Sequence, residues 1–312
     1  MSLDNRGLIN KAAISTDKIS SGLLQPYQAK KFLQQTFEAT ALRQQIRHEI
    51  RTEKTGEIDK IGIASRILRK KTENKDDGYR AGVETSQIEY ETKAVRLPWE
   101  ITEETLRENI EGQNFESIVT NLMTTQLGID LEDLDINGDE DVSATDPDYD
   151  FLKLNNGWLK QISAGGHIYD ASSYNSMSLD MFYNCLQAVP NKYNNGKLRW
   201  LMSPHRAQKW ELYLLNQVIT SGGAVPDNMY TAPAHIPVIE VPKLPDDKII
   251  LVDPKNLIEV KTYNVKIRKT TEGKEAIMQD KRFYVVHFDL DAVIEEIDAT
   301  AVMTNIPDFL NA

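Results

Sequence analysis

The segment from Leu97 to Asp139 constrains the fold of this chain more than any other. It places the end of a strand, a capped short helix and a long amphipathic helix one after another without a break. Thr102 can cap the first helical turn, where Glu103 and Glu104 interact favourably with the helix dipole. Apolar side chains then recur at helical spacing, at Phe115, Ile118, Val119, Leu122 and Met123. The segment therefore predicts a structural spine that buries one stripe, not an active site.

A chain of 312 residues with 40% apolar residues can fold into one large or two modest domains with a real core. The first twenty residues are charged and lack the apolar segment of a signal peptide, and no run approaches the length needed to cross a bilayer. We therefore expect a soluble protein that is not exported by a signal peptide. The single cysteine, Cys185, cannot form an internal disulfide, which fits a reducing compartment.

Charge is unevenly distributed along the chain, although the net charge is −11. Residues 1 to 75 carry fifteen basic and eight acidic side chains, whereas residues 100 to 150 carry sixteen acids and a single base, Arg107. The net negative charge should repel nucleic acid on average. The uneven distribution has two interpretations: two solvated faces, or a basic part of one copy that docks on the acidic part of another.

The N-terminal half predicts a polar arm, a helix from Gln25 to Gln45, and two strands, Ile58 to Leu68 and Gln87 to Leu97. The segment between the strands, Arg69 to Gly82, is rich in charge and glycine. Such a projecting two-stranded hairpin has few apolar side chains to bury and is marginally stable alone. Four apolar residues of the strands find no mate in the local sequence, so we expect the hairpin to need a neighbour: Ile61, Ile63, Ile67 and Tyr90.

After a polar loop from Asp139 to Asp150 the pattern changes to alternating elements, which predicts an α/β subdomain. Its expected elements are a helix capped by Ser178 and closed by Pro190, a strand from Leu198 to Met202, a helix from Ser203 to Asn216, and strands near Pro237 to Val241 and Lys248 to Val252. The last expected elements are strands from Ile258 to Thr270 and from Ala276 to Leu290 around a turn at 271–274, and a strand-like piece from Ala292 to Met303.

The best match to a metal motif is Asp133 to Gly138, which fits the first six positions of a calcium-binding helix-loop-helix loop. The match then fails, because the twelfth position is Ala144 in place of a bidentate glutamate and the eighth is Glu140 in place of an apolar residue. The sequence therefore favours an acidic loop at a helix end over a calcium site.

No constellation of catalytic residues anchors an enzyme hypothesis. The five histidines are scattered, and no nucleophile elbow, phosphate-cradling glycine loop or dinucleotide-binding glycine pattern occurs. Cys185 lies among apolar helix residues and is interpreted as a small buried hydrophobe. We therefore expect no enzyme activity, no metal and no cofactor; the alternative, an unusual active site between Asp170 and Gly223, lacks a nucleophile, metal or cofactor set.

Taken in order, these elements resemble the major capsid proteins of tailed bacteriophages, which have the Hong Kong 97 fold. The resemblance extends from about Leu23 to Thr304, and four stretches carry it: IDKIGIASR at Ile58 to Arg66, LPWEITEE at Leu97 to Glu104, the spine end GIDLEDLDINGD, and GWLKQ at Gly157 to Gln161. It implies an α+β capsid fold with an N-terminal arm (1–48), an extended β-hairpin loop (49–96), a peripheral domain with the long spine helix (97–159), an α/β axial domain (160–255) and closing antiparallel strands (256–312).

The resemblance also implies a function. Family members assemble as pentamers and hexamers into an icosahedral head that encloses double-stranded DNA without sequence-specific binding, and a net negative charge suits that role. The implied partners are other copies of the chain, a portal protein, and separate scaffolding or decoration proteins where these are used; no membrane is implied. The implied location is the virion, assembled in the host bacterial cytoplasm. The alternative is an encapsulin-like nanocompartment, whose shell shares the fold but encloses cargo enzymes.

In the family the extended loop of one subunit lies over its neighbour, which would bring the basic and acidic segments of two copies together. We expect a basic segment of the loop to dock near an acidic part of the spine region of an adjacent subunit. The basic residues are Arg66, Arg69, Lys70 and Lys71, and the acidic residues are Glu103, Glu104, Glu108 and Glu111. Some family members also crosslink a loop lysine to an asparagine, but no acceptor can be matched here, so no crosslink is predicted.

Overall fold

The computed structural model describes residues 40–62, 67–68, 70, 78–80, 82–104, 115–220, 232–262, 266–271 and 273–307. The helix expected from Gln25 to Gln45 lies outside these residues except at its end. Residues 41–45, which the structure describes, form turns and not helix. No helix in the described ranges is both long and apolar enough to span a membrane.

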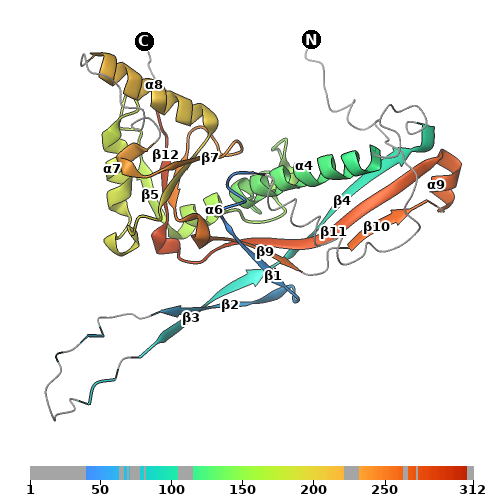
Figure 1. The fold of residues 1–312 in the computed structure, drawn as a ribbon, viewed down its shortest axis with the longest axis horizontal. Helices are drawn as coiled ribbons and strands as arrows, with labels where there is room; N and C mark the ends of the chain where they lie inside the picture. The colour runs from blue at the N-terminus through green and yellow to red at the C-terminus, as the bar shows by residue number, and fades with distance from the viewer. Residues whose placement is uncertain are drawn as a thin grey trace.

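The larger of two five-stranded sheets is organised around the 14-residue strand β11 (Lys281–Ile294). β4 (Lys93–Thr102) pairs antiparallel with β11 on one side, and β10 (Lys266–Thr270) pairs with it on the other. Farther along β11, β9 (Leu257–Thr262) follows β10, and β1 (Arg47–Arg51) pairs in parallel with β9. The strands β4, β11 and β10 thus form a long ribbon that extends from the body (Figure 1).

The spine helix α4 (Phe115–Asn137) lies along this ribbon and covers one face of it (Figure 1). The helix is confirmed, but the expected stripe is partly wrong, because Ile118 and Leu122 are exposed. The buried row follows a spacing of four residues, through Val119, Met123, Leu127 and Leu131, and ends at Leu134. Ile118 and Leu122 lie on the adjacent row of the helix, about 100° away, beyond the width of the narrow ribbon.

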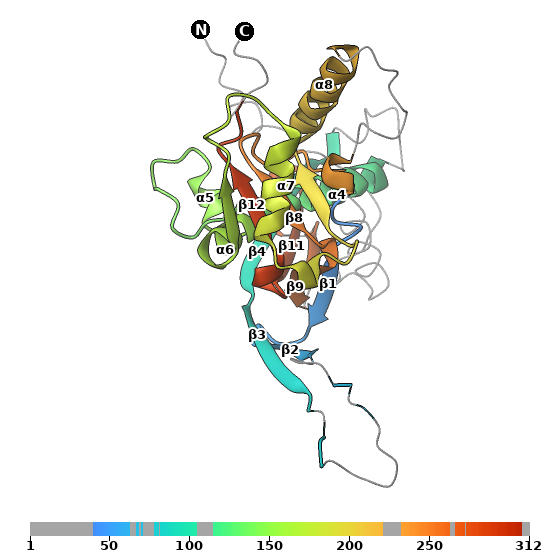
Figure 2. The same cartoon turned by 90° about the vertical axis from the view of Figure 1, so that its left-hand side faces the viewer.

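The second sheet has the strand order β5, β12, β8, β6, β7. Its strands are β5 (His167–Asp170), β6 (Arg199–Met202), β7 (Val238–Glu240), β8 (Ile249–Val252) and β12 (Ala301–Thr304). Helices α7 (Leu179–Ala188) and α8 (Pro204–Thr220) pack on one face, and α6 (Trp158–Gly165) packs on the other. In Figure 2 the molecule is turned so that this part, at the left of Figure 1, faces the viewer.

The α/β prediction for this part is confirmed, including the helix start at Pro204. Cys185 is buried in α7 as expected, and burial raises the pKa of its thiol to about 12. Phe182 contacts the rings of Trp200 and Trp210 edge to face, which fixes the two helices against the sheet. Ser178 precedes α7, but its side chain makes no capping hydrogen bond, so that detail was wrong.

The other helical elements in the part of the chain that the structure describes are short. They include α5 (Tyr149–Leu152), α9 (Lys274–Gln279) and the single turns η2 (Asn191–Tyr193), η3 (Pro233–His235), η4 (Pro254–Asn256) and η5 (Ile297–Ala299).

Three of the expected C-terminal elements differ from the structure. The strand expected from Ile258 to Thr270 is two strands, β9 and β10, which pair with different parts of β11. α9 occupies the end of the expected turn and the start of the strand expected from Ala276, so β11 begins only at Lys281. The strand-like piece from Ala292 to Met303 is split, because its first residues finish β11 and its last form β12 in the other sheet. Between them, η5 redirects the chain.

The hairpin consists of β2 (Thr55–Gly62) and β3 (Glu84–Glu91), and it projects from the body (Figure 1). The single strand expected from Gln87 to Leu97 is two strands, because the chain leaves the hairpin at Glu91 and enters the large sheet at Lys93. At Thr92, the backbone N–H and the side-chain hydroxyl both donate to the carbonyl of Lys54. The inward face changes there from even-numbered to odd-numbered residues, which one alternating pattern cannot represent.

Two of the stretches that carry the family resemblance meet at a glycine contact. Gly138 follows the spine helix and Gly157 precedes α6, and the N–H of Gly157 donates to the carbonyl of Gly138 at 2.8 Å. A Cβ at Gly138 would lie 2.3 Å from the carbonyl oxygen of Asn155, so only glycine fits. This contact fixes the end of the spine helix against the start of α6.

We predict that Gly138→Ala destabilises the subunit by about 1–3 kcal/mol or more, because backbone must move to admit the methyl group. Gly82→Ala is the matched control, since a Cβ there meets nothing within 4 Å. Urea unfolding of both variants measures the difference. Equal midpoints for the two variants would contradict the proposed backbone clash.

Candidate functional site

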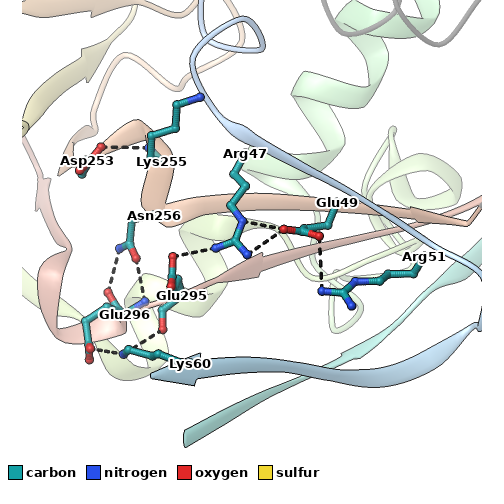
Figure 3. A network of polar contacts seen from close by, with 9 residues as sticks. All are labelled: Arg47, Glu49, Arg51, Lys60, Asp253, Lys255, Asn256, Glu295 and Glu296. Carbon is teal, nitrogen blue, oxygen red and sulfur yellow. Dashed lines mark hydrogen bonds and ion pairs between the residues drawn. The ribbon is translucent and has the colours of Figure 1, made fainter. Parts of the chain in front are cut away.

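The hairpin leaves the body at a junction that we call the loop base, formed by β1, β2, β9, η4 and residues 294–296 at the end of β11. Charged side chains from β1, β2, η4 and residues 295–296 lie close together there (Figure 3). Because the loop base sets the direction of the hairpin, it is the candidate functional site.

The hairpin is attached to its own chain by an apolar contact at the loop base. Ile58 and Tyr90 are buried against three residues of β9 and β11: Ile258, Val260 and Val293. The local sequence offers Tyr90 no apolar mate, but distant strands of its own chain do, so the expectation that this part of the hairpin needs a neighbouring molecule was wrong for Tyr90. Ile61 and Ile67 do remain exposed, at 73% and 44%, and Ile63 lies outside the described residues. The base of the hairpin thus packs on its own chain, whereas Ile61 and Ile67, farther out, do not.

A half-exposed polar network links the hairpin to the body around this contact (Figure 3). Lys60 of β2 forms an ion pair with Glu296, and Arg47 of β1 pairs with Glu295 at 3.1 Å. Asn256 holds Glu296 from both sides, donating to its carbonyl at 2.8 Å and accepting from its N–H at 2.7 Å. Single pairs of this kind contribute about 0–1 kcal/mol each, so their role is to fix direction more than to add stability.

A second, buried charge cluster lies beneath the loop base, and Arg43 is at its centre. The Arg43 guanidinium is 1% exposed and donates to Asp135 of the spine helix at 3.0 Å and to Glu259 of β9. His48 of β1 contacts Glu259 through Nδ1 at 2.7 Å and the carbonyl of Arg43 through Nε2 at 2.7 Å. The cluster joins the end of the N-terminal segment to the spine helix and the large sheet.

Burial and neighbouring charges shift the pKa values of the two carboxylates of the cluster in opposite directions. Burial raises the pKa of Asp135 well above its usual range, and the negative charge of Glu259 adds to this. Burial would also raise the pKa of Glu259, but the positive charges of Arg43 and Lys261 hold it well below its usual range. Lys261 lies 3.0 Å from Glu259, and burial lowers its pKa to about 8.

Sequence reasoning missed this cluster. Glu259 and Lys261 alternate with Ile258 and Val260, which is the pattern of a half-exposed strand, but all six residues of β9 are buried. Asp135 was assigned to an acidic loop, yet Asp133 to Asn137 are the last turn of α4. The available signal was the pair of opposite charges within an otherwise apolar strand.

The calcium-like residues are held by other partners. Asp133 pairs with Lys243 at 2.9 Å and accepts from Asn137 at 2.8 Å, while Asp135 binds Arg43. In the described parts of the chain, no three His, Cys, Asp or Glu side chains gather in a way that could hold a metal ion.

Three of the eight expected docking residues lie in described parts of the chain: Lys70, Glu103 and Glu104. Lys70 and Glu104 are exposed, and Glu103 pairs with Arg282 of its own chain. The other five lie outside the described residues: Arg66, Arg69, Lys71, Glu108 and Glu111. The hairpin projects from one end of the body and β4 ends at Thr102 toward the other (Figure 1), so a contact between these segments needs two chains.

We predict that Arg43→Ala destabilises the subunit by about 3–5 kcal/mol, because two carboxylates would be left buried without their shared cation. Arg47→Ala, at the half-exposed network, should cost only about 0–1 kcal/mol. Urea unfolding at neutral pH measures both. A cost for Arg43→Ala as small as that for Arg47→Ala would contradict the role of the cluster.

The lowered pKa of Lys261 predicts a pH dependence of stability. The folded chain loses the Lys261 proton near pH 8, whereas the unfolded chain keeps it to its ordinary value of 10.5. Between these values the unfolded chain binds more protons, so the Lys261 contribution to stability rises with pH. The unfolding free energy of the parent minus that of Lys261→Met should therefore increase from pH 8 to pH 10. A difference that stays flat or falls would refute the assignment.

The chain is similar to known proteins in sequence and in structure. No protein-family model matches the chain. A curated relative from Bacillus subtilis (strain 168), provisionally named prophage capsid protein YqbE, is 27% identical over 323 residues, covering 97% of this chain and 99% of the relative.

Solved capsid structures share the fold at low sequence identity. The procapsid of satellite phage P4 with its size determination protein matches with a TM-score of 0.67 at 15% identity, covering 97% of this chain and 96% of the other. The SrpI encapsulin of Synechococcus elongatus PCC 7942 matches with a TM-score of 0.53 at 12% identity, covering 100% and 99%. The similarity to a capsid relative over almost the whole chain and the shared fold agree with the resemblance seen in the sequence, and the chain has the α+β fold of Hong Kong 97-type capsid proteins.

Proposed function

We propose that the chain assembles with copies of itself, as pentamers and hexamers, into an icosahedral shell that encloses phage double-stranded DNA. The observation that carries this proposal is the hairpin, which is fastened at its base but extends with exposed apolar residues. Ile61, Leu68 and Val83 are 73%, 94% and 62% exposed. A two-stranded ribbon has no core of its own, so these side chains need a surface on another molecule.

The family architecture supplies the finer parts of the proposal. The arm is residues 1–48, the extended loop 49–96, the peripheral domain 97–159 with 256–312, and the axial domain 160–255. The shell forms in the host cytoplasm, joins a portal protein, and uses separate scaffolding or decoration proteins if it uses any. A net charge of −11 supports a lining that encloses DNA without holding its phosphates strongly.

An encapsulin-type compartment is the second candidate, and the match to SrpI over the whole chain favours it. The two functions differ in what the shell contains. Purified particles should show closed shells by negative-stain electron microscopy, and particles from infected or induced cells should protect double-stranded DNA from nuclease. Shells that hold a protein cargo and no DNA would favour the compartment, and a chain that stays monomeric would refute both.

We also predict that the basic loop segment docks near the acidic start of the spine region of an adjacent subunit, so reversing its charge should hinder assembly. The variant Arg69→Glu with Lys70→Glu should form shells more slowly than the parent at low salt, and the difference should shrink at high salt because charges are screened. Head formation is followed by light scattering, with circular dichroism as a check of subunit folding. Equal rates of shell formation for the variant and the parent at low salt would show that these charged side chains are only exposed to solvent at the loop tip and make no contact with another subunit.

A further inference from the structure

The two faces of the hairpin differ in chemistry. The face that carries Ile58, Lys60 and Tyr90 is turned to the body. On the opposite face, Glu57 lies directly across from Glu89 in the antiparallel register, and Asp59 follows on the same side; all three are exposed. Glu91 at the end of this face pairs with Lys93 at 3.5 Å, but no cation in the described residues pairs with the other three carboxylates. We call Glu57, Asp59 and Glu89 the acidic hairpin face.

Like charges directly opposite each other weaken a pair of strands. Among its described residues the hairpin has few contacts to offset this repulsion, since those that pack on the body belong to its base. A cation supplied from outside the chain would remove the repulsion between Glu57 and Glu89. The acidic hairpin face therefore has the chemistry of a surface that awaits a basic partner.

The ribbon of β4, β11 and β10 has a basic face on the side away from the spine helix. Arg96 of β4 lies directly across from His287 of β11, and Arg268 of β10 lies across from Val285. Arg96, His287 and Arg268 are exposed, and none has an ion-pair partner among the residues that the structure describes. Val285 is half-buried and adds an apolar centre. We call Arg96, Arg268 and His287 the basic ribbon face.

The acids that share this side of the ribbon are already neutralised. Glu100 pairs with Lys281 at 2.9 Å, and Asp289 pairs with Lys54 at 3.2 Å. The basic ribbon face is therefore a local positive area on a chain whose net charge is −11.

The two faces cannot meet within one chain. The hairpin is held at its base by Ile58, Tyr90 and Lys60, so its acidic face is turned away from its own body. The hairpin and the free part of the ribbon also extend toward opposite ends of the molecule (Figure 1). Contact between them requires a second copy of the chain.

We infer that the acidic hairpin face of one subunit docks on the basic ribbon face of another. Glu57 and Glu89 then lie against Arg96 and Arg268, with exposed Ile61 near the apolar centre at Val285. This inference rests on the proposed shell function and assigns the two surfaces of one contact within it. It differs from the docking of the loop tip on the spine region, because it involves the base half of the hairpin and the opposite sign of charge.

A charge-swap experiment tests the inference. Glu57→Lys with Glu89→Lys should slow shell formation about tenfold or more at low salt, and so should Arg96→Glu with Arg268→Glu, because each places like charges in contact. A chain that carries all four substitutions restores the opposite signs and the net charge, and should recover a rate close to that of the parent. Circular dichroism and thermal melting check that each variant folds.

A matched control separates the acidic hairpin face from a general charge effect. Glu84 is exposed on the same strand as Glu89, but it belongs to the other face of the hairpin. Glu84→Lys should therefore assemble much faster than Glu89→Lys at the same salt concentration. Equal rates for these two variants, or no recovery in the fourfold variant, would overturn the inference.

Engineered cysteines give a direct readout of the contact. The native Cys185 is buried, so it gives little background. Mixed subunits that carry Glu89→Cys or Arg268→Cys should form intermolecular disulfides under mild oxidation when shells assemble, whereas Glu84→Cys with Arg268→Cys should not. Shells of the mixed cysteine variants that assemble without this crosslink would refute the contact alone, and a parent that forms no shell would refute the proposed function as well.

Discussion

The buried contact of Arg43 with Asp135 and Glu259 is the interaction on which the arrangement of this subunit depends. These residues are far apart in sequence, and each belongs to a different part of the molecule: the segment before β1, the spine helix and the large sheet. Removing three charges from water is costly, so they are stable only when all three are in place. The cluster therefore specifies one relative position of these parts, and the apolar contact of Ile58 and Tyr90 then builds the loop base on that frame.

The base of the hairpin is held against the body, whereas described apolar side chains farther out are exposed. Near the body, buried side chains and the network of Arg47, Lys60 and Glu296 hold it in one direction. Farther out, Ile61, Ile67, Leu68 and Val83 are exposed. In the proposed shell, a hairpin that is already held in one direction at its base would lose less conformational entropy when it contacts another subunit.

The sequence predicted those parts of the fold whose signals are local. The spine helix, α7, α8 and three strands of the smaller sheet follow from periodicity and from Pro204 at a helix start. Pairings between distant segments were not predictable in this way. β1 pairs with β9 across more than 200 residues, and buried Glu259 has the same alternating neighbours as a solvent-facing glutamate. The sequence did not predict the split at Thr92, because residues typical of β-strands continue on both sides of it while the buried face changes from even-numbered to odd-numbered residues.

The continuity of β3 and β4 through Thr92 has a mechanical consequence. β4 is hydrogen-bonded to β11 over ten residue pairs, so a pull on the hairpin loads that ladder in shear, with many hydrogen bonds resisting together. The two bonds from Thr92 to the carbonyl of Lys54 keep the two hairpin strands from separating at the junction. In a pressurised container, tension on one subunit's loop would thus pass into the ribbon beneath its spine helix, and every subunit would act as a tensile link.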